Sequence, residues 1–230
     1  MKRAHAFLIT SALLTGCAAS IQNNTKTQYV NETFSAENLR DGGMALFPVT
    51  AGQGQEGYRR PLGDFLNDSL QYAVPRGSVL TWQATMDSLN QHRAVDEYQH
   101  VIEAYAQTSI VDREKVKTLS EAVHVRYALF CALQRFEQLS KTSYSVWTGW
   151  STANSADVMA HCLILDLRTG DVMQEIVGEA MSVGGSTYYN SPYEAYAKVL
   201  AQSVLSQIPG SSVKPPGTTR KPGTKSLHSR

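Results

Sequence analysis

The sequence predicts an α/β fold of the α+β kind, with a mixed sheet of about five strands packed against helices. Three observations favour it. Residues 56–122 carry mostly helical spacing of apolar side chains. Residues 125–183 hold three segments rich in β-formers with a period of two. A last segment, 191–208, returns to helical spacing. We therefore expect the sheet to end in an antiparallel meander.

Residues 1–16 have the features of an export signal. They begin with the basic sequence MKR, continue with about ten mostly apolar residues from Ala4 to Leu13, and end in two small residues before Cys17. An apolar run of this length is too short to cross about 30 Å of hydrocarbon as a helix. We expect the segment to direct export and to be removed.

The sequence Leu14-Thr15-Gly16-Cys17 resembles the bacterial lipobox. The resemblance implies that Cys17 is diacylated on sulfur, becomes the first residue of the mature chain, and is then N-acylated. Two or more acyl chains make a stable membrane anchor. Ala18 follows the cysteine instead of an aspartate, which resembles the outer-membrane address. The alternative is an ordinary signal peptide with a chance cysteine.

The mature chain divides into three parts. Residues 17–41 are rich in Asn, Thr and Gln and are expected to form a lipidated polar linker. Residues 42–208 are expected to form one periplasmic domain. Residues 209–230 are rich in Pro, Gly, Ser and Thr, with few large apolar side chains, and are expected to be a disordered basic tail.

The charge balance argues against nucleic acid as a partner. Loss of Lys2 and Arg3 from the 21 basic residues leaves 19 against 20 acidic ones. The tail holds five Lys or Arg and no acid. It could contact acidic lipid headgroups or cell-wall polymer, or it could be solvated without a dedicated partner.

The first half of the domain predicts two short strands and four helices. A buried strand is expected in 42–50, and a glycine-rich turn, GQGQEG, precedes a helix with one apolar stripe. The turn lacks both the Gly-Lys-Ser/Thr and the G-x-G-x-x-G pattern of phosphate-binding loops. A second strand is expected at 78–82. Further helices are expected at 83–91, 94–108 and 112–122, with Asp112 as the N-cap of the last one.

The second half predicts the meander and a closing helix. Strands are expected at 125–138, 157–167 and 172–183, with RTGD as the turn before the third. In the closing helix, Ser191 is the expected cap and Glu194 completes a capping box.

Cys131 and Cys162 remain after the lipidated residue. If the first two meander strands pair around a loop centred near residue 146, positions whose numbers sum to 293 face each other, and these two cysteines do so. An exported protein can form a disulfide there. The alternative is two buried free thiols. Neither is expected to be catalytic, because each lies on an apolar face in mid-strand.

The connection between these strands, residues 139–156, is expected to be a long loop. It places Tyr144, Trp147 and Trp150 among Ser, Thr and Gly. Such rings commonly anchor protein interfaces and membrane surfaces. We therefore take these three residues as a candidate contact surface for a partner protein or the membrane. The alternative is that the rings fold back over the sheet edge.

Four stretches together resemble a known family of periplasmic domains: MALFPVT, YRRPLGDFLNDSL, LSEAVHVRYALFCAL and LILDLRTGDVM. The domain is similar to that of the curli-secretion lipoprotein, the lipoprotein activator of a penicillin-binding protein, and the N-terminal domain of TolB. The likeness covers about residues 42–208. It implies a non-enzymatic binding, scaffold or assembly role at the periplasmic face of the outer membrane, with an envelope protein or further copies as partner.

One departure concerns pore formation. The curli protein builds a pore from long amphipathic hairpins, and the sequence offers no pair of about ten-residue alternating segments for this purpose. A pore subunit is therefore the less favoured alternative.

A hydrolytic envelope enzyme is the other alternative. We find no catalytic motif, no metal-ligand spacing and no cofactor-binding loop, so no catalytic residue, metal or cofactor is assigned.

Overall fold

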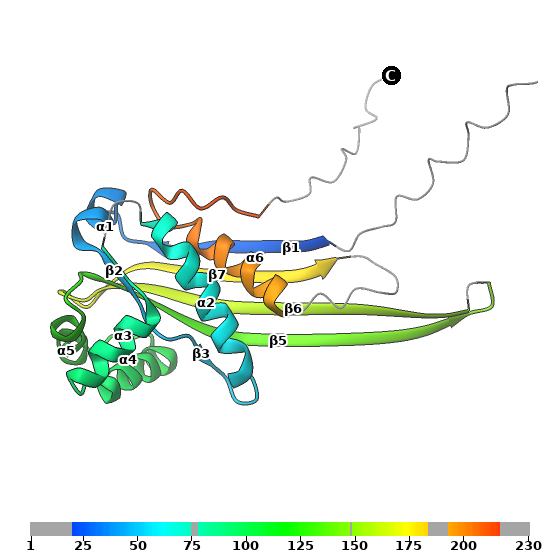
Figure 1. The fold of residues 1–230 in the computed structure, drawn as a ribbon, viewed down its shortest axis with the longest axis horizontal. Helices are drawn as coiled ribbons and strands as arrows, with labels where there is room; N and C mark the ends of the chain where they lie inside the picture. Colours follow the sequence, from blue (N-terminus) through cyan, green and yellow to red (C-terminus); the bar gives the residue numbers. More distant parts are fainter. Residues whose placement is uncertain (1–19, 75–77, 148, 184–192, 217–230) are drawn as a thin grey trace, which may run out of the picture.

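The structure, a computed structural model, describes residues 20–74, 78–147, 149–183 and 193–216 (Figure 1). Within them lie six helices and a mixed sheet of seven strands. The predicted fold class is confirmed. The helices are α1 Ala36–Gly42, α2 Glu56–Ala73, α3 Trp82–Gln91, α4 Val95–Thr108, α5 Arg113–Val123 and α6 Tyr193–Leu205. The strands are β1 Ser20–Val30, β2 Met44–Leu46, β3 Thr50–Ala51, β4 Val79–Leu80, β5 Tyr127–Ser145, β6 Gly149–Asp166 and β7 Asp171–Val183.

The sheet has the order β1-β7-β6-β5-β2-β4, with β3 added beside β5. The predicted meander is β5, β6 and β7, whose neighbours pair antiparallel. The short strands β2 and β3 pair parallel to β5, and β4 pairs parallel to β2. Cys131 faces Cys162, as the summed positions predict. Further along β5, a bulge between Leu133 and Arg135 shifts the register by one residue.

Helices cover both faces of the sheet, because alternate strand residues point to opposite sides. On one face, Met44, Leu129 and Ile164 pack with α1, α2 and α6. On the other, Phe47 and Phe130 pack with α3, α4 and α5. Buried apolar side chains on both sides thus fix the sheet between two helical layers (Figure 1).

The helix signals of the sequence are largely observed. Asp112 caps α5, and its carboxylate accepts hydrogen bonds from the backbone N–H groups of Glu114 and Lys115. The hydroxyl of Thr81 caps α3 in the same way. The capping residue expected for the last helix, Ser191, lies outside the described residues.

The first part of the mature chain differs from the expected linker. Residues 20–30 form β1, an edge strand paired with β7 along its length. Its side chains alternate between half-buried and exposed, and the Asn23 amide donates to the Ser203 hydroxyl of α6 at 2.5 Å. Ser35 then caps α1. The expectation of a spacer over 17–41 is therefore wrong for residues 20–41.

Part of the expected disordered tail is also ordered. After α6, residues 209–216 run along the helical layer, and Ser212 donates both its N–H and its hydroxyl to the carbonyl of Tyr72 at 3.0 and 2.7 Å. Val213 packs against the core of that face. The Pro, Gly, Ser and Thr residues of this stretch predict disorder from residue 209 on, and this expectation is wrong for residues 209–216. The remainder, 217–230, lies outside the described residues.

Close contact between α6 and the sheet requires a glycine at position 178 of β7. A Cβ atom placed there would lie 2.6 Å from Leu200 Cδ1 and 2.9 Å from Val204 Cγ2. Both distances are well inside van der Waals contact, so any side chain would push α6 away from the strand.

In the described part of the chain, no helix is both long enough and apolar enough to cross a membrane.

Candidate functional site

The segment expected to be a loop is a long two-stranded hairpin. β5 continues to Ser145 and β6 begins at Gly149, with Tyr144 opposite Trp150 near its end. The expectation of a loop over 139–156 is wrong. Thr, Tyr, Trp and Val favour strands, but Ser and Asn between them hide the alternation that would have revealed it. We call residues 138–156 the hairpin arm.

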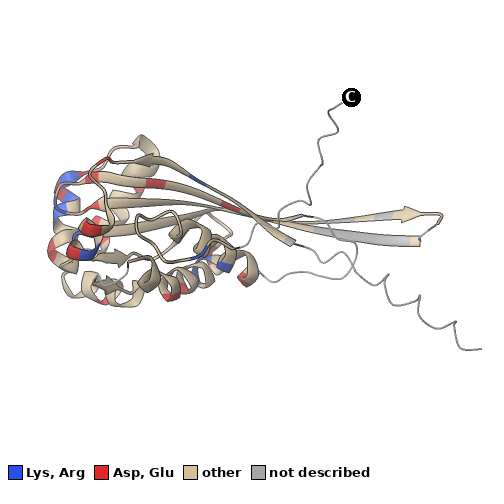
Figure 2. Ribbon diagram, turned by 90° about the horizontal axis from the view of Figure 1, so that it is seen from above, with Lys and Arg blue, Asp and Glu red and all other residues tan. Residues whose placement is uncertain are grey.

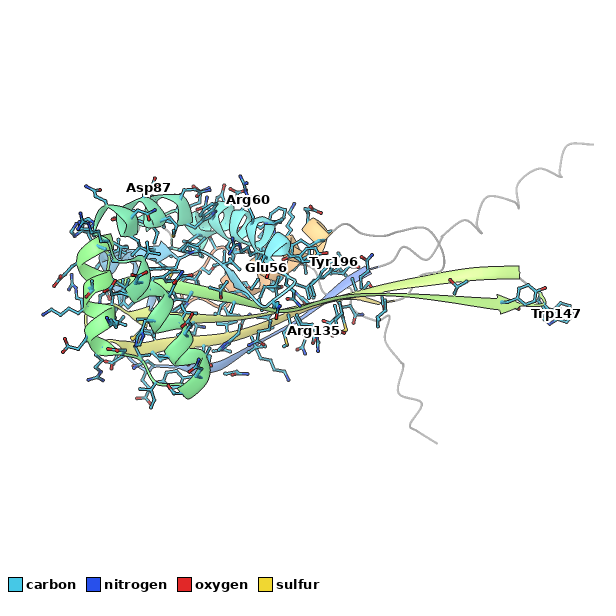
Figure 3. The ribbon with its side chains drawn as sticks, turned by 90° about the horizontal axis from the view of Figure 1, so that it is seen from below. Glu56, Arg60, Asp87, Arg135, Trp147 and Tyr196 are labelled. Atoms are coloured by element: carbon cyan, nitrogen blue, oxygen red, sulfur yellow. A yellow bond between two sulfur atoms is a disulfide. The ribbon has the colours of Figure 1, made fainter. Side chains whose placement is uncertain are left out.

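The arm stands away from the body of the molecule. Figure 3 shows Trp147 at its far end and Arg135 near the place where it leaves the sheet. From Gln138 to Ser145 the chain advances about 24 Å at the usual rise of a strand. Gly149 has φ +71, a left-handed conformation that suits glycine at the end of a tight hairpin turn.

The tip is apolar and solvent-exposed. Trp147 is 95% exposed and Val146 is 86% exposed, while Tyr144 is 61% exposed. The alternative in which these rings fold back over the sheet edge is therefore wrong for Trp147. The side chain of Trp150 lies outside what the structure describes. A soluble monomer gains nothing by placing a full indole in water, so this exposure marks a candidate contact surface.

The arm is almost free of charge. Between Gln138 and Ala156 the sequence has one charged residue, Lys141, and no carboxylate. In Figure 2 the blue and red residues lie on the body of the molecule. An arm of this composition enters a headgroup region without having to desolvate a carboxylate.

A cluster of charges holds the base of the arm on one face of the sheet. The Arg135 guanidinium donates to the Asp157 carboxylate and, at 3.3 Å, to that of Glu179. These residues come from β5, β6 and β7. Because their side chains are only 36%, 29% and 22% exposed, their mutual pairing is screened less than that of surface ions.

Aromatic side chains hold the base on the opposite face. The ring centre of Phe136 lies 4.5 Å from that of Tyr58 in α2 and 5.0 Å from that of Tyr193 in α6. The Tyr58 and Tyr193 ring centres are 4.8 Å apart. Burial raises the pKa of the Tyr193 hydroxyl far above its usual value. The arm is therefore clamped on both faces before it leaves the body.

The arm leaves from the end of the sheet where β1 begins. Ser20 pairs with Val183 of β7. Two residues earlier, Met181 pairs with Asp157, which pairs with Glu137. The first residue of β1 is therefore level with the base of the arm, as Figure 1 shows for the dark blue end of the strand. The predicted lipidation site, Cys17, precedes Ser20 by three residues and lies outside the described residues.

The two cysteines of the domain are joined in the structure. Cys131 and Cys162 form a disulfide between adjacent strands, with their Cα atoms 4.1 Å apart. Both are almost fully buried on the face covered by α2 and α6. The disulfide joins β5 to β6 within the body of the molecule, four to five residues along β5 before the clamping residues Arg135 and Phe136.

The glycine-rich stretch before α2 forms a turn, as expected, and the N–H groups of Gly54 and Gln55 donate hydrogen bonds within it. The N–H of Gly54 donates to the Glu56 carboxylate at 3.1 Å. Hydrogen bonds from the backbone of Glu56 and Gly54 lower the pKa of this carboxyl. A carboxylate of the chain thus occupies the place that a bound anion would take.

Two hollows lie on the face of α4. A cavity of about 200 Å³ is lined by Tyr105, His161 and Glu175, among others. His161 Nε2 lies 2.7 Å from Glu175 Oε1, and the Tyr105 hydroxyl donates to the same oxygen at 3.4 Å. Burial, followed by the charge of Glu175, raises the pKa of Tyr105. A groove of about 800 Å³ lies beyond it, where Trp82 Nε1 donates to Asp64 at 3.2 Å. The polar side chains named here, in both hollows, thus form hydrogen bonds with one another.

Among the described residues, no group of three or more His, Cys, Asp or Glu side chains is placed to hold a metal ion.

The expectation about pore-forming hairpins needs correction. The chain does have a pair of long strands beyond its body, in the arm. Its composition is nevertheless not amphipathic. One row of the β5 part reads Gln138, Ser140, Thr142 and Tyr144, and the other row includes Lys141. Neither row is apolar along its length.

No protein-family model matches the chain, and no curated protein matches it. Several solved structures are similar. The PelC dodecamer from Paraburkholderia phytofirmans has a TM-score of 0.46 and 11% identity, covering 80% of this chain and 96% of that one. Lipoprotein GNA1162 from Neisseria meningitidis has a TM-score of 0.36 and 16% identity, with 72% and 96% covered. The LpoB C-terminal domain from Salmonella enterica has a TM-score of 0.32 and 12% identity, with 70% and 88% covered.

With TM-scores below 0.5, these likenesses decide nothing about function, which is inferred from this chain's own residues.

Proposed function

We propose that this protein is a lipid-anchored factor of the periplasmic face of the outer membrane, with a non-enzymatic binding, scaffold or assembly role in the cell envelope. Its domain is held at the bilayer by acyl chains on Cys17, and the tip of the hairpin arm is its contact surface. The observation that carries the proposal is the exposure of Trp147, 95%, at the end of an arm without a carboxylate.

The position of the arm makes the bilayer itself its first contact. Three peptide units separate Cys17 from Ser20, a span of at most about 11 Å. Ser20 is level with the base of the arm. An acylated Cys17 therefore holds the base within about 11 Å of the headgroups. An arm of about 24 Å that points toward the membrane is longer than this distance, so its tip reaches into the bilayer surface.

The chemistry of the tip suits that depth. Trp and Tyr concentrate at the boundary between headgroups and acyl chains, where one end of the ring is wet and the other apolar. Val146 adds aliphatic surface, and Lys141 is the one charged residue in the sequence of the arm. Acyl chains and tip together would hold the domain in one orientation relative to the membrane.

The anchor is tested by fractionating cells that produce the natural chain or its Cys17→Ser variant. We expect the natural chain in the outer-membrane fraction, with an N-terminal peptide that starts at Cys17 and carries the mass of its acyl chains. The variant should leave that fraction. A natural chain recovered without acyl groups, or a variant that sediments as before, would refute the anchoring.

A second role, assembly of several copies, is favoured by the exposed apolar side chains of the arm, Leu139, Val146 and Trp147. Pairing of β5 with β2 and β3 ends at Leu133, and pairing of β6 with β7 begins only at Asp157. Between these positions the two strands of the arm pair with each other. A two-stranded ribbon is marginal alone in water, so packing of these side chains against those of another copy would stabilise it.

The anchor restricts the symmetry of such an assembly. Antiparallel pairing of two β1 strands would put the two Ser20 residues at opposite ends, about 34 Å apart, so that the two anchors could not share a bilayer. Copies must then stand the same way up, around an axis normal to the membrane. Sedimentation in detergent tests this: a closed ring supports assembly, and a monomer at all concentrations argues against it.

A further inference from the structure

Two helix C-termini meet on the α3–α5 side of the molecule. α3 ends at Gln91 with His92 as its C-cap, and α5 ends at Val123 with His124 as its C-cap. The Ser88 hydroxyl of α3 donates to a backbone carbonyl of the last turn of α5, that of residue 122, at 2.5 Å. The relative position of the two ends is therefore fixed by the fold.

The helix dipoles favour positive charge at the place where these two ends meet. The last turn of a helix carries carbonyl groups without helical partners, equivalent to about half a negative charge. Neither α3 nor α5 has a basic residue in its last turn. Two such ends close together make a site where positive charge is stabilised, and each of them bears an imidazole.

The two imidazoles are placed like ligands of one ion. Their ring centres are 5.9 Å apart, with the ring planes at 86°. Rings that each bring one nitrogen to about 2.0–2.1 Å from the same metal have centres about 5–6 Å apart. Both side chains are exposed, so a small turn of either ring costs little.

The hydrogen bond of His92 determines which of its ring nitrogens is available to bind a metal ion. Its Nδ1 lies 2.9 Å from the Ser88 carbonyl oxygen. A carbonyl can only accept, so Nδ1 carries the proton and Nε2 keeps its lone pair. Histidines that bind metals commonly donate their other ring N–H to a backbone carbonyl in this way. Ser88 thus supports the site twice, through its hydroxyl and through its carbonyl.

We propose that His92 and His124 form a binding site for a divalent transition-metal ion of the zinc type. Neutral imidazole suits Zn²⁺, Ni²⁺ and Cu²⁺. Two protein ligands leave the other coordination positions to water, so the ion exchanges with solvent. When bound, it joins the ends of α3 and α5 and stabilises the folded chain by mass action.

The test uses the full chain in detergent, without a polyhistidine tag, titrated with ZnCl₂ by calorimetry and by thermal unfolding. We expect one ion per chain and a higher Tm with zinc. His92→Ala and His124→Asn should each weaken binding at least about tenfold and abolish the rise in Tm. Asparagine is chosen at position 124 because its φ is +55, a left-handed conformation that asparagine tolerates.

His100→Ala is the matched control. His100 is another exposed histidine, paired with Asp112 at 3.3 Å. Its loss should leave zinc binding unchanged. Because His92 and His124 are exposed, both variants should keep the metal-free Tm of the natural chain. Zinc binding that survives both substitutions, or one ion shared by two chains, would overturn the proposal.

Discussion

Replacing Trp147 by alanine should weaken attachment of the chain to a bilayer. An indole side chain offers about 200 Å² of surface, and that of Trp147 is 95% exposed. At about 25 cal/mol per Å², full burial would be worth about 5 kcal/mol. A ring at the interface is about half immersed, so about 2.5 kcal/mol is lost on truncation. This corresponds to about a sixtyfold lower partition coefficient.

The effect is measured on the full chain carrying Cys17→Ser, since acyl chains would otherwise dominate the binding. The assay is cosedimentation with vesicles of phosphatidylethanolamine and phosphatidylglycerol. Tyr72→Ala is the control, because Tyr72 is an aromatic residue of α2 that is 57% exposed away from the arm. Equal partitioning of the Trp147→Ala variant and its parent, or an equal loss with Tyr72→Ala, would refute the assignment of the tip to the membrane.

Three further predictions concern the body of the protein. Replacing Cys131 and Cys162 together by alanine should lower the free energy of unfolding by about 3–4 kcal/mol in denaturant titrations, because the bond closes a loop of 31 residues; an unchanged midpoint would contradict this. Gly178→Ala should cost about 1–3 kcal/mol, since its Cβ would overlap Leu200, and thermal unfolding measures it; an unchanged Tm would mean that α6 can shift freely. Burial raises the pKa of Tyr193, so the unfolded chain loses this proton first. Stability is then complete below about pH 10 and falls above it, and Tyr193→Phe should flatten that fall by about 1.4 kcal/mol per pH unit; an unaltered slope in alkaline urea titrations would contradict it.

The meander and most helices could be predicted from sequence because their signals are local. Apolar side chains at a period of two fix which residues of β5, β6 and β7 face α2 and α6. A symmetric hairpin then fixes which positions face each other, so that Cys131 could be placed opposite Cys162. Asp112 before an apolar stripe similarly marked the start of α5.

β1 could not be predicted in this way because it is an edge strand with a polar composition. It packs on α6 through Ile21 and through hydrogen bonds such as that of Asn23 to Ser203. Its sequence, SIQNNTKTQYV, shows too few apolar residues to reveal a period. What makes it a strand is pairing with β7, a contact between residues more than 140 positions apart.

The arm could not be predicted from sequence for a related reason. The apolar side chains that the structure describes on it beyond the base, such as Leu139, Val146 and Trp147, are exposed, so burial does not impose alternation on their sequence. The candidate contact residues could nevertheless be predicted, because two indoles in a stretch of Ser, Thr and Gly are a compositional signal that does not depend on secondary structure. What the sequence could not supply is their place: Trp147 at the tip, at the end of the molecule where β1 begins.

The most direct test measures the depth of Trp147 in a membrane that also holds the acylated Cys17. The chain is reconstituted with Trp82→Phe and Trp150→Phe, so that one indole remains, in vesicles whose lipids carry bromine at defined depths. We predict strong quenching by bromine placed near the headgroups and weaker quenching by bromine placed deeper in the acyl chains. Emission of a water-exposed indole, unquenched at every depth, would contradict the account.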